Sequence, residues 1–306
     1  MSQESNPPDF VGRSGVRSAR EQGIKWLLFG CAALSIAVTT AIVATLLVDA
    51  VDFFLSVPPL EFFLGTTWSP SIDQEFGVLP LVSGTLFVTA LSALIAIPVG
   101  VASATYLSEY ASERTRSILK PSLEILAGIP TVVYGYFALV YLTPALEWLG
   151  VPLSTFNALS ASIMVGIMII PMVSSLSEDA MSAVPDSLRQ AGYGMGATKL
   201  EVSTGVVIPA AASGIFSSFI LALSRAIGET MIVVVAAGMR PRLVPSPFES
   251  LEVMTAAMVQ LVTTDIAGGS TAYKAMFAIG ITLFTITFAM NLTSSFVASR
   301  YREEYK

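Results

Sequence analysis

The sequence predicts an all-α integral membrane protein with six transmembrane helices. Hydrophobic residues make up 54% of the chain and charged residues only 12%, whereas soluble domains carry about 25% charged residues. Six uncharged stretches are each longer than the roughly 20 residues that a helix needs to cross a bilayer. These stretches are Trp26–Val48, Phe76–Ser108, Ile125–Leu146, Trp148–Ser177, Val202–Ser224 and Ala275–Ser299.

Two other architectures fit these stretches poorly. Backbone groups in lipid must be hydrogen-bonded within the protein, so only helices and closed barrels span a membrane. The stretches are too long and too continuously apolar for barrel strands, which alternate apolar and polar residues. A large soluble helical protein would need polar faces at helical spacing, which these stretches lack.

Lysine and arginine predict the orientation, because cytoplasmic loops carry the excess of positive charge. With the N-terminus inside, twelve cations fall on inside segments and three, Arg240, Arg242 and Lys274, fall outside. The chain is therefore expected to be a multi-pass protein of the plasma or inner membrane, with both termini in the cytoplasm. We expect a disordered N-terminus over 1–23, an anchor helix over 24–48, a transmembrane domain over 77–299 and a cytoplasmic tail over 300–306.

One inside loop, 178–209, carries a distinctive spacing. Gln190-Ala191-Gly192 is followed by three residues, then Gly196, nine more residues and the segment Val206-Val207-Ile208-Pro209. This spacing resembles the loop by which permeases of ABC importers bind their ATPase, whose pattern begins Glu-Ala-Ala. The sequence departs from the pattern at Gln190 and Gly192, and the alternative is an ordinary solvated loop.

Arg225 and Glu229 are the only charged residues between Val202 and Met239. A charge within the bilayer is costly, so its presence points to a function. At a spacing of i and i+4, the two side chains are expected to share a helix face and to pair. In the functional interpretation Arg225 attracts an anion, because its planar fork suits tetrahedral oxyanions. The alternative is a structural salt bridge between helices.

The third stretch contains the run Gly128-Ile129-Pro130-Thr131-Val132-Val133-Tyr134. Glycine and proline loosen a membrane helix where it faces protein or a water-filled cavity. Thr131 and Tyr134 are therefore candidates to line the substrate path, although close helix packing through small residues explains the run equally well. Lys120 and Glu124, also at i and i+4, are expected to pair at the cytoplasmic entry.

Five segments together resemble the permease subunits of phosphate ABC importers of the PstC kind, from about Gly77 to Val297. They are Gly77–Thr85, Tyr106–Ala111, Gly128–Gly135, Gln190–Pro209 and Ser224–Met231. The resemblance implies the type I (MetI-like) importer fold. It also implies a PstA-like second permease, two ATPase subunits that bind ATP and Mg²⁺, and an extracytoplasmic phosphate-binding protein, with phosphate entering a cavity in the membrane.

Other functions remain as alternatives. A permease for molybdate, tungstate or sulfate would share the loop, and a secondary anion transporter or channel would work without ATP. Catalysis by this chain is not expected, because it has no histidine and no phosphate-binding loop. No cofactor, metal or nucleic acid is expected to bind it, and its lone Cys31 excludes an internal disulfide. The chain is expected to be surrounded by membrane lipid.

Overall fold

The computed structural model describes residues 15–264 and 266–300, in two compact units that cover 1–49 and 50–306. Helix α1 (Gly15–Ser56) supplies residues 15–49 of the first unit and continues into the second. The helix starts earlier than predicted, so residues 15–23 are helical instead of disordered. The rest of the predicted disordered segment, 1–14, and residues 301–306 of the predicted tail lie outside the described residues.

Within the described residues, the regular elements of the second unit are helices and one short β-ribbon. After α1, its elements are α2 (Pro59–Leu64), β1 (Trp68–Ser69), β2 (Glu75–Phe76), α3 (Leu79–Thr105), the π-helical turn η1 (Tyr106–Tyr110), α4 (Glu113–Gly128), α5 (Thr131–Phe137), η2 (Ala138–Leu142), α6 (Thr143–Trp148) and α7 (Ala158–Ser182). The remaining elements are α8 (Asp186–Gly194), α9 (Lys199–Val202), η3 (Ser203–Val207), α10 (Ile208–Ala210), α11 (Ala212–Ile227), α12 (Met231–Ala236), α13 (Met254–Thr263) and α14 (Thr271–Arg300).

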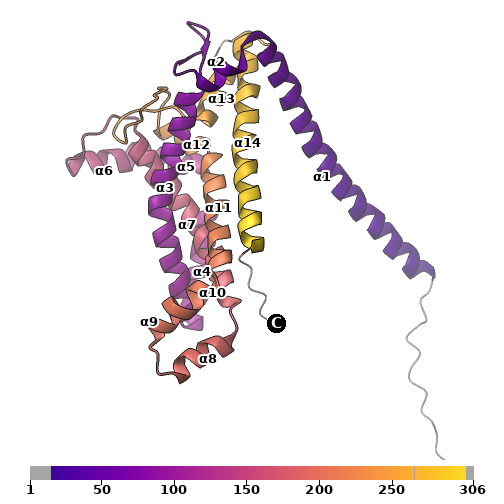
Figure 1. Ribbon diagram of the computed structural model, residues 1–306, viewed down its shortest axis with the longest axis vertical. Coiled ribbons are helices and arrows are strands. Elements are labelled where there is room, and N and C mark those ends of the chain that lie inside the picture. Colours follow the sequence, from indigo (N-terminus) through magenta and orange to yellow (C-terminus); the bar gives the residue numbers. More distant parts are fainter. Residues whose placement is uncertain (1–14, 265, 301–306) are drawn as a thin grey trace, which may run out of the picture. The chain divides into compact units, whose positions relative to one another are not determined.

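Helices α3, α7, α11 and α14 form the bundle at the centre of this unit (Figure 1). α3 lies along α7, and α11 contacts both α7 and α14. Small residues allow the close approach of α3 and α7: a Cβ atom on Gly100 would lie 2.6 Å from Cγ1 of Val173. Close packing through small residues is typical of helices in membranes, where burial of apolar surface gives little driving force.

The end of the unit that carries α2 and the β1–β2 ribbon has its own aromatic cluster. Phe53, Phe62, Trp68 and Phe76 are all buried, and Trp68 pairs with Phe76 across the antiparallel β1–β2 ribbon. Their rings meet edge to face at centroid distances of 5.4–6.4 Å, a favourable geometry for aromatic pairs. The cluster therefore fixes the segment between α1 and α3 against the bundle.

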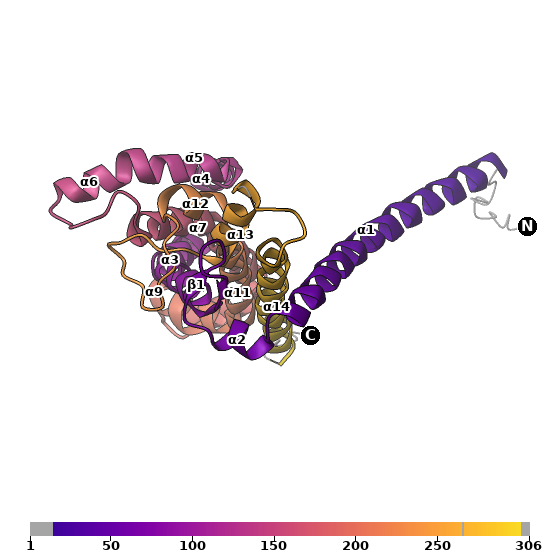
Figure 2. The same ribbon diagram turned by 90° about the horizontal axis from the view of Figure 1, so that it is seen from above.

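By length and composition, the described residues contain four straight helices that are able to cross a membrane, and six spans if each of two bent pairs counts as one. The third predicted stretch is bent by 87° between 113–128 and 131–148, and the fifth by 70° between 199–210 and 212–227. In Figure 2, α5 and α6 lie along one side of the bundle, and α6 extends beyond it. The fourth predicted stretch is shifted: the helix begins at Ala158, after a loop, and ends at Ser182.

Candidate functional site

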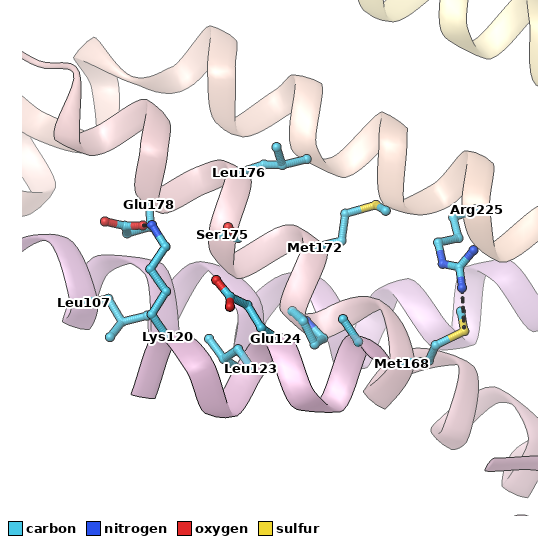
Figure 3. Close-up of a pocket in the computed structure, with 12 residues that line it drawn as sticks. Leu107, Lys120, Leu123, Glu124, Met168, Met172, Ser175, Leu176, Glu178 and Arg225 are labelled. Atoms are coloured by element: carbon cyan, nitrogen blue, oxygen red, sulfur yellow. Dashed lines mark hydrogen bonds and ion pairs between the residues drawn. The ribbon is translucent and has the colours of Figure 1, made fainter. Parts of the chain in front are cut away.

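A cavity of about 340 Å³ lies between α4, α7 and α11, next to η1 (Figure 3). Its volume falls within the range of about 300–1,000 Å³ that is usual for small-ligand sites. Most of its wall is apolar, and four charged residues also line it. The lining residues are Leu107, Lys120, Leu123, Glu124, Ala127, Met168, Pro171, Met172, Ser175, Leu176, Glu178 and Arg225.

Arg225 lies at one end of this cavity, in the last turn of α11. Its Nη2 atom lies 3.7 Å from the sulfur of Met168 on α7. Within the described residues it has no carboxylate partner at ion-pair distance. Arg225 is exposed, and its planar guanidinium is suited to bind an anion in the cavity through parallel hydrogen bonds.

The predicted pair between Arg225 and Glu229 is wrong. α11 ends at Ile227 and Gly228 follows it, so the helical register that would bring the two side chains together is interrupted. Glu229 instead caps α12: its Oε1 accepts hydrogen bonds from the backbone N–H groups of Met231 at 3.1 Å and Ile232 at 3.3 Å. The side chain is buried, and a carboxylate is favourable at a helix N-terminus.

The opposite end of the cavity carries a cluster of charges that joins α4 to α7. Glu178, only 2% exposed, forms ion pairs with Arg116 and Lys120. The Lys120 Nζ atom lies 2.8 Å from Glu178 and 3.4 Å from Asp179. The predicted Lys120–Glu124 pair is therefore replaced by pairs across to α7. Glu178 was assigned to the loop over 178–209 and instead belongs to α7.

Thr131 and Tyr134 are not among the residues that line this cavity. Thr131 begins α5, directly after the bend at Pro130. Tyr134 is buried, and its hydroxyl donates a hydrogen bond to the Leu126 carbonyl at 2.8 Å, across that bend. Tyr134 therefore braces the corner between α4 and α5. A role for either residue in the path stays a prediction.

The loop with the distinctive spacing folds as two short helices, α8 and α9, joined by a turn. α8 continues through Gly192 and Gly194, and the break between the two helices lies at residues 195–198. Gly196 has a φ of +84°, which favours glycine. Thr198 then starts α9 with a capping box, in which its hydroxyl and the Glu201 side chain each satisfy a backbone N–H group.

The residues of the loop pattern divide into exposed and packed ones. Gln190 and Ala191 are exposed on α8, whereas Gly192 is buried, and a Cβ atom there would lie 2.9 Å from Cγ2 of Val202. Glycine at this position therefore allows α8 to close on α9. Pro209 is exposed and lies in α10, just before the 70° bend. Tyr193, Met195 and Leu200 add exposed apolar surface.

Arg189 is the residue in this loop that the sequence analysis missed. Its Nη2 atom lies 3.0 Å from Oε1 of Glu109 on η1 and also donates to the Met181 carbonyl at 2.8 Å. Nη1 donates to the Val184 carbonyl. The side chains of Arg189 and Glu109 are 14% and 4% exposed. Arg189 thus ties α8 to the end of α7 and also to η1, which lies 80 residues away in the sequence, so that no local pattern predicts the pair with Glu109.

Residues 96–303 match the family model described as the binding-protein-dependent transport system inner membrane component. The matched segment contains the cavity and the α8–α9 loop together. The chain belongs to this family. It is the transmembrane permease subunit of an ABC importer and a multi-pass membrane protein.

Individual relatives of this permease support the family assignment. It is 33% identical over 279 residues to the probable ABC transporter permease protein YqgH of Bacillus subtilis, with 90% of each chain covered. It is 32% identical over 265 residues to the phosphate transport system permease protein PstC of Mesorhizobium japonicum, with 80% of each chain covered.

Solved importers share the fold of the permease at low sequence identity. A chain of a bacterial ABC transporter for alginate superposes with a TM-score of 0.65 at 14% identity, covering 94% of this chain and 100% of the other. A chain of the methionine transporter MetNI, in an inward-facing conformation, gives a TM-score of 0.56 at 15% identity, covering 74% and 95%. The MetI-like permease fold predicted from the sequence is therefore confirmed.

Proposed function

We propose that this permease carries inorganic phosphate across the membrane in an ATP-driven importer. The observation that supports this most directly is Arg225, which lines an otherwise largely apolar cavity and has no carboxylate partner in the described part of the chain. A planar guanidinium binds the oxygens of a tetrahedral oxyanion through parallel hydrogen bonds. Several relatives at about 30% identity carry the name of phosphate permease.

The proposal includes the partners that the resemblance implies. A PstA-like second permease would complete the path, and two ATPase subunits would bind ATP and Mg²⁺. An extracytoplasmic binding protein would deliver phosphate. The excess of Lys and Arg on the inside segments supports a topology with both termini in the cytoplasm. In that topology α8 and α9 face the ATPases, and the exposed apolar residues Tyr193, Met195 and Leu200 offer a contact surface.

Energy would reach the cavity through this loop. Closure of the ATPases on ATP would move α8, and Arg189 would transmit the movement to Glu109 and to the end of α7. Phosphate must then bind differently in the two conformations, because a ligand with equal affinity for both drives no change. Exposure of Arg225 to the outside in only one conformation would supply that difference.

Uptake of ³²P-phosphate by the complete importer in proteoliposomes, with its binding protein, tests the proposal. Arg225→Ala removes the positive charge, and Arg225→Lys keeps the charge but loses the planar fork. We expect both variants to lower uptake at least about tenfold, as for the loss of a charge-assisted hydrogen bond. Assembly should be unchanged, as checked by co-purification of all subunits.

Arg114→Ala is the matched control. Arg114 is exposed in the first turn of α4 and does not line the cavity, so its loss should leave uptake unchanged. Normal uptake by Arg225→Ala would refute the assignment of Arg225. A wild-type importer that takes up molybdate, tungstate or sulfate but no phosphate would refute the choice of substrate, and uptake without ATP would support a secondary transporter instead.

A further inference from the structure

The cavity wall contains a carboxylate that an anion pathway should avoid. Glu124 lies on α4 and lines the same cavity as Arg225. Figure 3 shows its carboxylate between Lys120 and Arg225 along the cavity. No ion pair or hydrogen bond of its side chain is found among the described residues, since Lys120 pairs with Glu178 and Asp179 instead. Glu124 is exposed, and its carboxylate is therefore free to meet a ligand in the cavity.

The neighbouring charges do not neutralise it. At the Lys120 end, two cations, Arg116 and Lys120, already pair with two carboxylates, Glu178 and Asp179. That cluster is balanced without Glu124. Among the groups that line the cavity, this leaves one uncompensated cation, Arg225, and one uncompensated anion, Glu124. Both residues are exposed, so a ligand that enters the cavity is able to reach them.

We infer that Glu124 selects for an oxyanion that still carries a proton. The inference rests on the proposed transport of phosphate and names the residue that sets its specificity. Phosphate keeps at least one P–OH group at neutral pH, and that group donates a hydrogen bond to a carboxylate. Sulfate, molybdate and tungstate have lost all their protons at this pH. They present only negative oxygens to Glu124 and are repelled.

Arg225 and Glu124 line the same cavity from different helices, Arg225 from α11 and Glu124 from α4. A tetrahedral ion presents oxygens in several directions at once. It is therefore able to accept hydrogen bonds from a guanidinium on one helix and to donate one to a carboxylate on another.

The hydrogen-bonding groups of the cavity match the oxygens of a protonated phosphate. Arg225 donates hydrogen bonds to the unprotonated oxygens, and Glu124 accepts one from the P–OH group. Ser175, which also lines the cavity, is able to donate to a third oxygen. A site that relies on a donor in its ligand rejects an analogue without that donor, because the acceptor is then left without a partner.

The test uses the assembled importer of permeases and ATPases without its binding protein, so that selection by the binding protein does not mask that of the cavity. Equilibrium binding of ³²P-phosphate is competed with arsenate, which is protonated like phosphate, and with sulfate, which is not. In the wild type, arsenate should displace phosphate at similar concentrations, and sulfate should need at least about ten times more. In Glu124→Gln the advantage of phosphate over sulfate should fall about tenfold, because the amide donates to sulfate and no longer repels it.

Two further variants make the result specific. Glu124→Asp keeps the carboxylate and should keep the preference for phosphate over sulfate. Glu113→Gln removes an exposed carboxylate from the same helix, away from the cavity, and should leave the preference unchanged. Equal phosphate-to-sulfate ratios in the wild type and Glu124→Gln would overturn the inference.

Equal competition by sulfate and arsenate in the wild type would also overturn it, without the need for any variant. A wild-type importer that binds sulfate or molybdate but no phosphate would refute the proposed function itself. The two failures are therefore distinguishable in one experiment.

Discussion

The attachment of α8 to the rest of the permease depends on one arginine, and Arg189→Met removes it with little change in side-chain length. The variant loses the ion pair with Glu109 at 3.0 Å and the hydrogen bonds to the Met181 and Val184 carbonyls. Because the Glu109 side chain is only 4% exposed, the variant also leaves a nearly buried carboxylate without its cation, with the hydrogen bond from the Ser108 hydroxyl still in place.

The expected loss follows from this burial. Breaking a buried ion pair by removing one partner costs about 3–5 kcal/mol. Arg189 itself is 14% exposed, so water compensates part of the loss, and we take the lower end, about 3 kcal/mol. That value corresponds to a change of about 150-fold in the equilibrium between attached and detached α8. Asp186→Ala is the control: its carboxylate also pairs with Arg189 but is 85% exposed, and such pairs contribute about 1 kcal/mol or less.

Two measurements on the reconstituted importer check this expectation. Hydrogen exchange of the α8 amides should become about 100-fold faster in Arg189→Met, since exchange follows local detachment. The amount of phosphate taken up for each ATP hydrolysed should fall, because in the proposed coupling the closure of the ATPases would no longer move the membrane helices. Glu109→Gln should act in the same direction, with the double variant less than additive. Wild-type protection of α8 in Arg189→Met would refute the reasoning.

Two other predictions concern packing and pH. Gly192→Ala places a methyl group 2.9 Å from Cγ2 of Val202, so we expect a loss of about 1 kcal/mol and a lower melting temperature. Val202→Ala should restore part of that loss in the double variant, and an unchanged melting temperature would contradict the contact. For Glu252, 1% exposed, burial raises the pKa from 4.5 to about 7. As the pH rises, Glu252 ionises first in the unfolded chain and only near pH 7 in the folded one. Its contribution to the free energy of unfolding is therefore complete below about pH 4.5, falls between about pH 4.5 and 7, and is constant above that. The total loss is about 3 kcal/mol. Glu252→Gln should abolish this slope in thermal melts, and a wild-type profile that is flat from pH 5 to 8 would argue against it.

The sequence located the membrane segments well, because the apolar length that a bilayer demands is a local property. All six predicted stretches contain apolar helix in the structure. It could not give the bends at residues 129–130 and 211. Pro130 marks the first as a weak point, but the angle depends on which helices α5 packs against, and here α12 and α7 are among them.

The site was predicted only in part, for a similar reason. Arg225 stood out because an arginine within an apolar stretch is costly, and it does line a cavity. Its pairing with Glu229 assumed a continuous helix, and Gly228 ends that helix. The partners of Glu178 and Arg189 lie 58–80 residues away in sequence, so only the tertiary fold brings them together. The role of Gly192 likewise required the position of Val202.

The elements that hold α8 in place also form the wall at one end of the cavity. Arg189 connects α8 to η1, whose Leu107 lines the cavity, and to the end of α7, which carries Glu178 and Ser175. α4 is connected to α7 by the ion pairs of Glu178 with Arg116 and Lys120. A displacement of α8 therefore acts first on the end of the cavity near Lys120. Arg225 contacts Met168, ten residues before Glu178 on α7, or about 15 Å away along the helix. In the proposed mechanism, this separation would let the Lys120 end open or close while an anion stayed bound at Arg225.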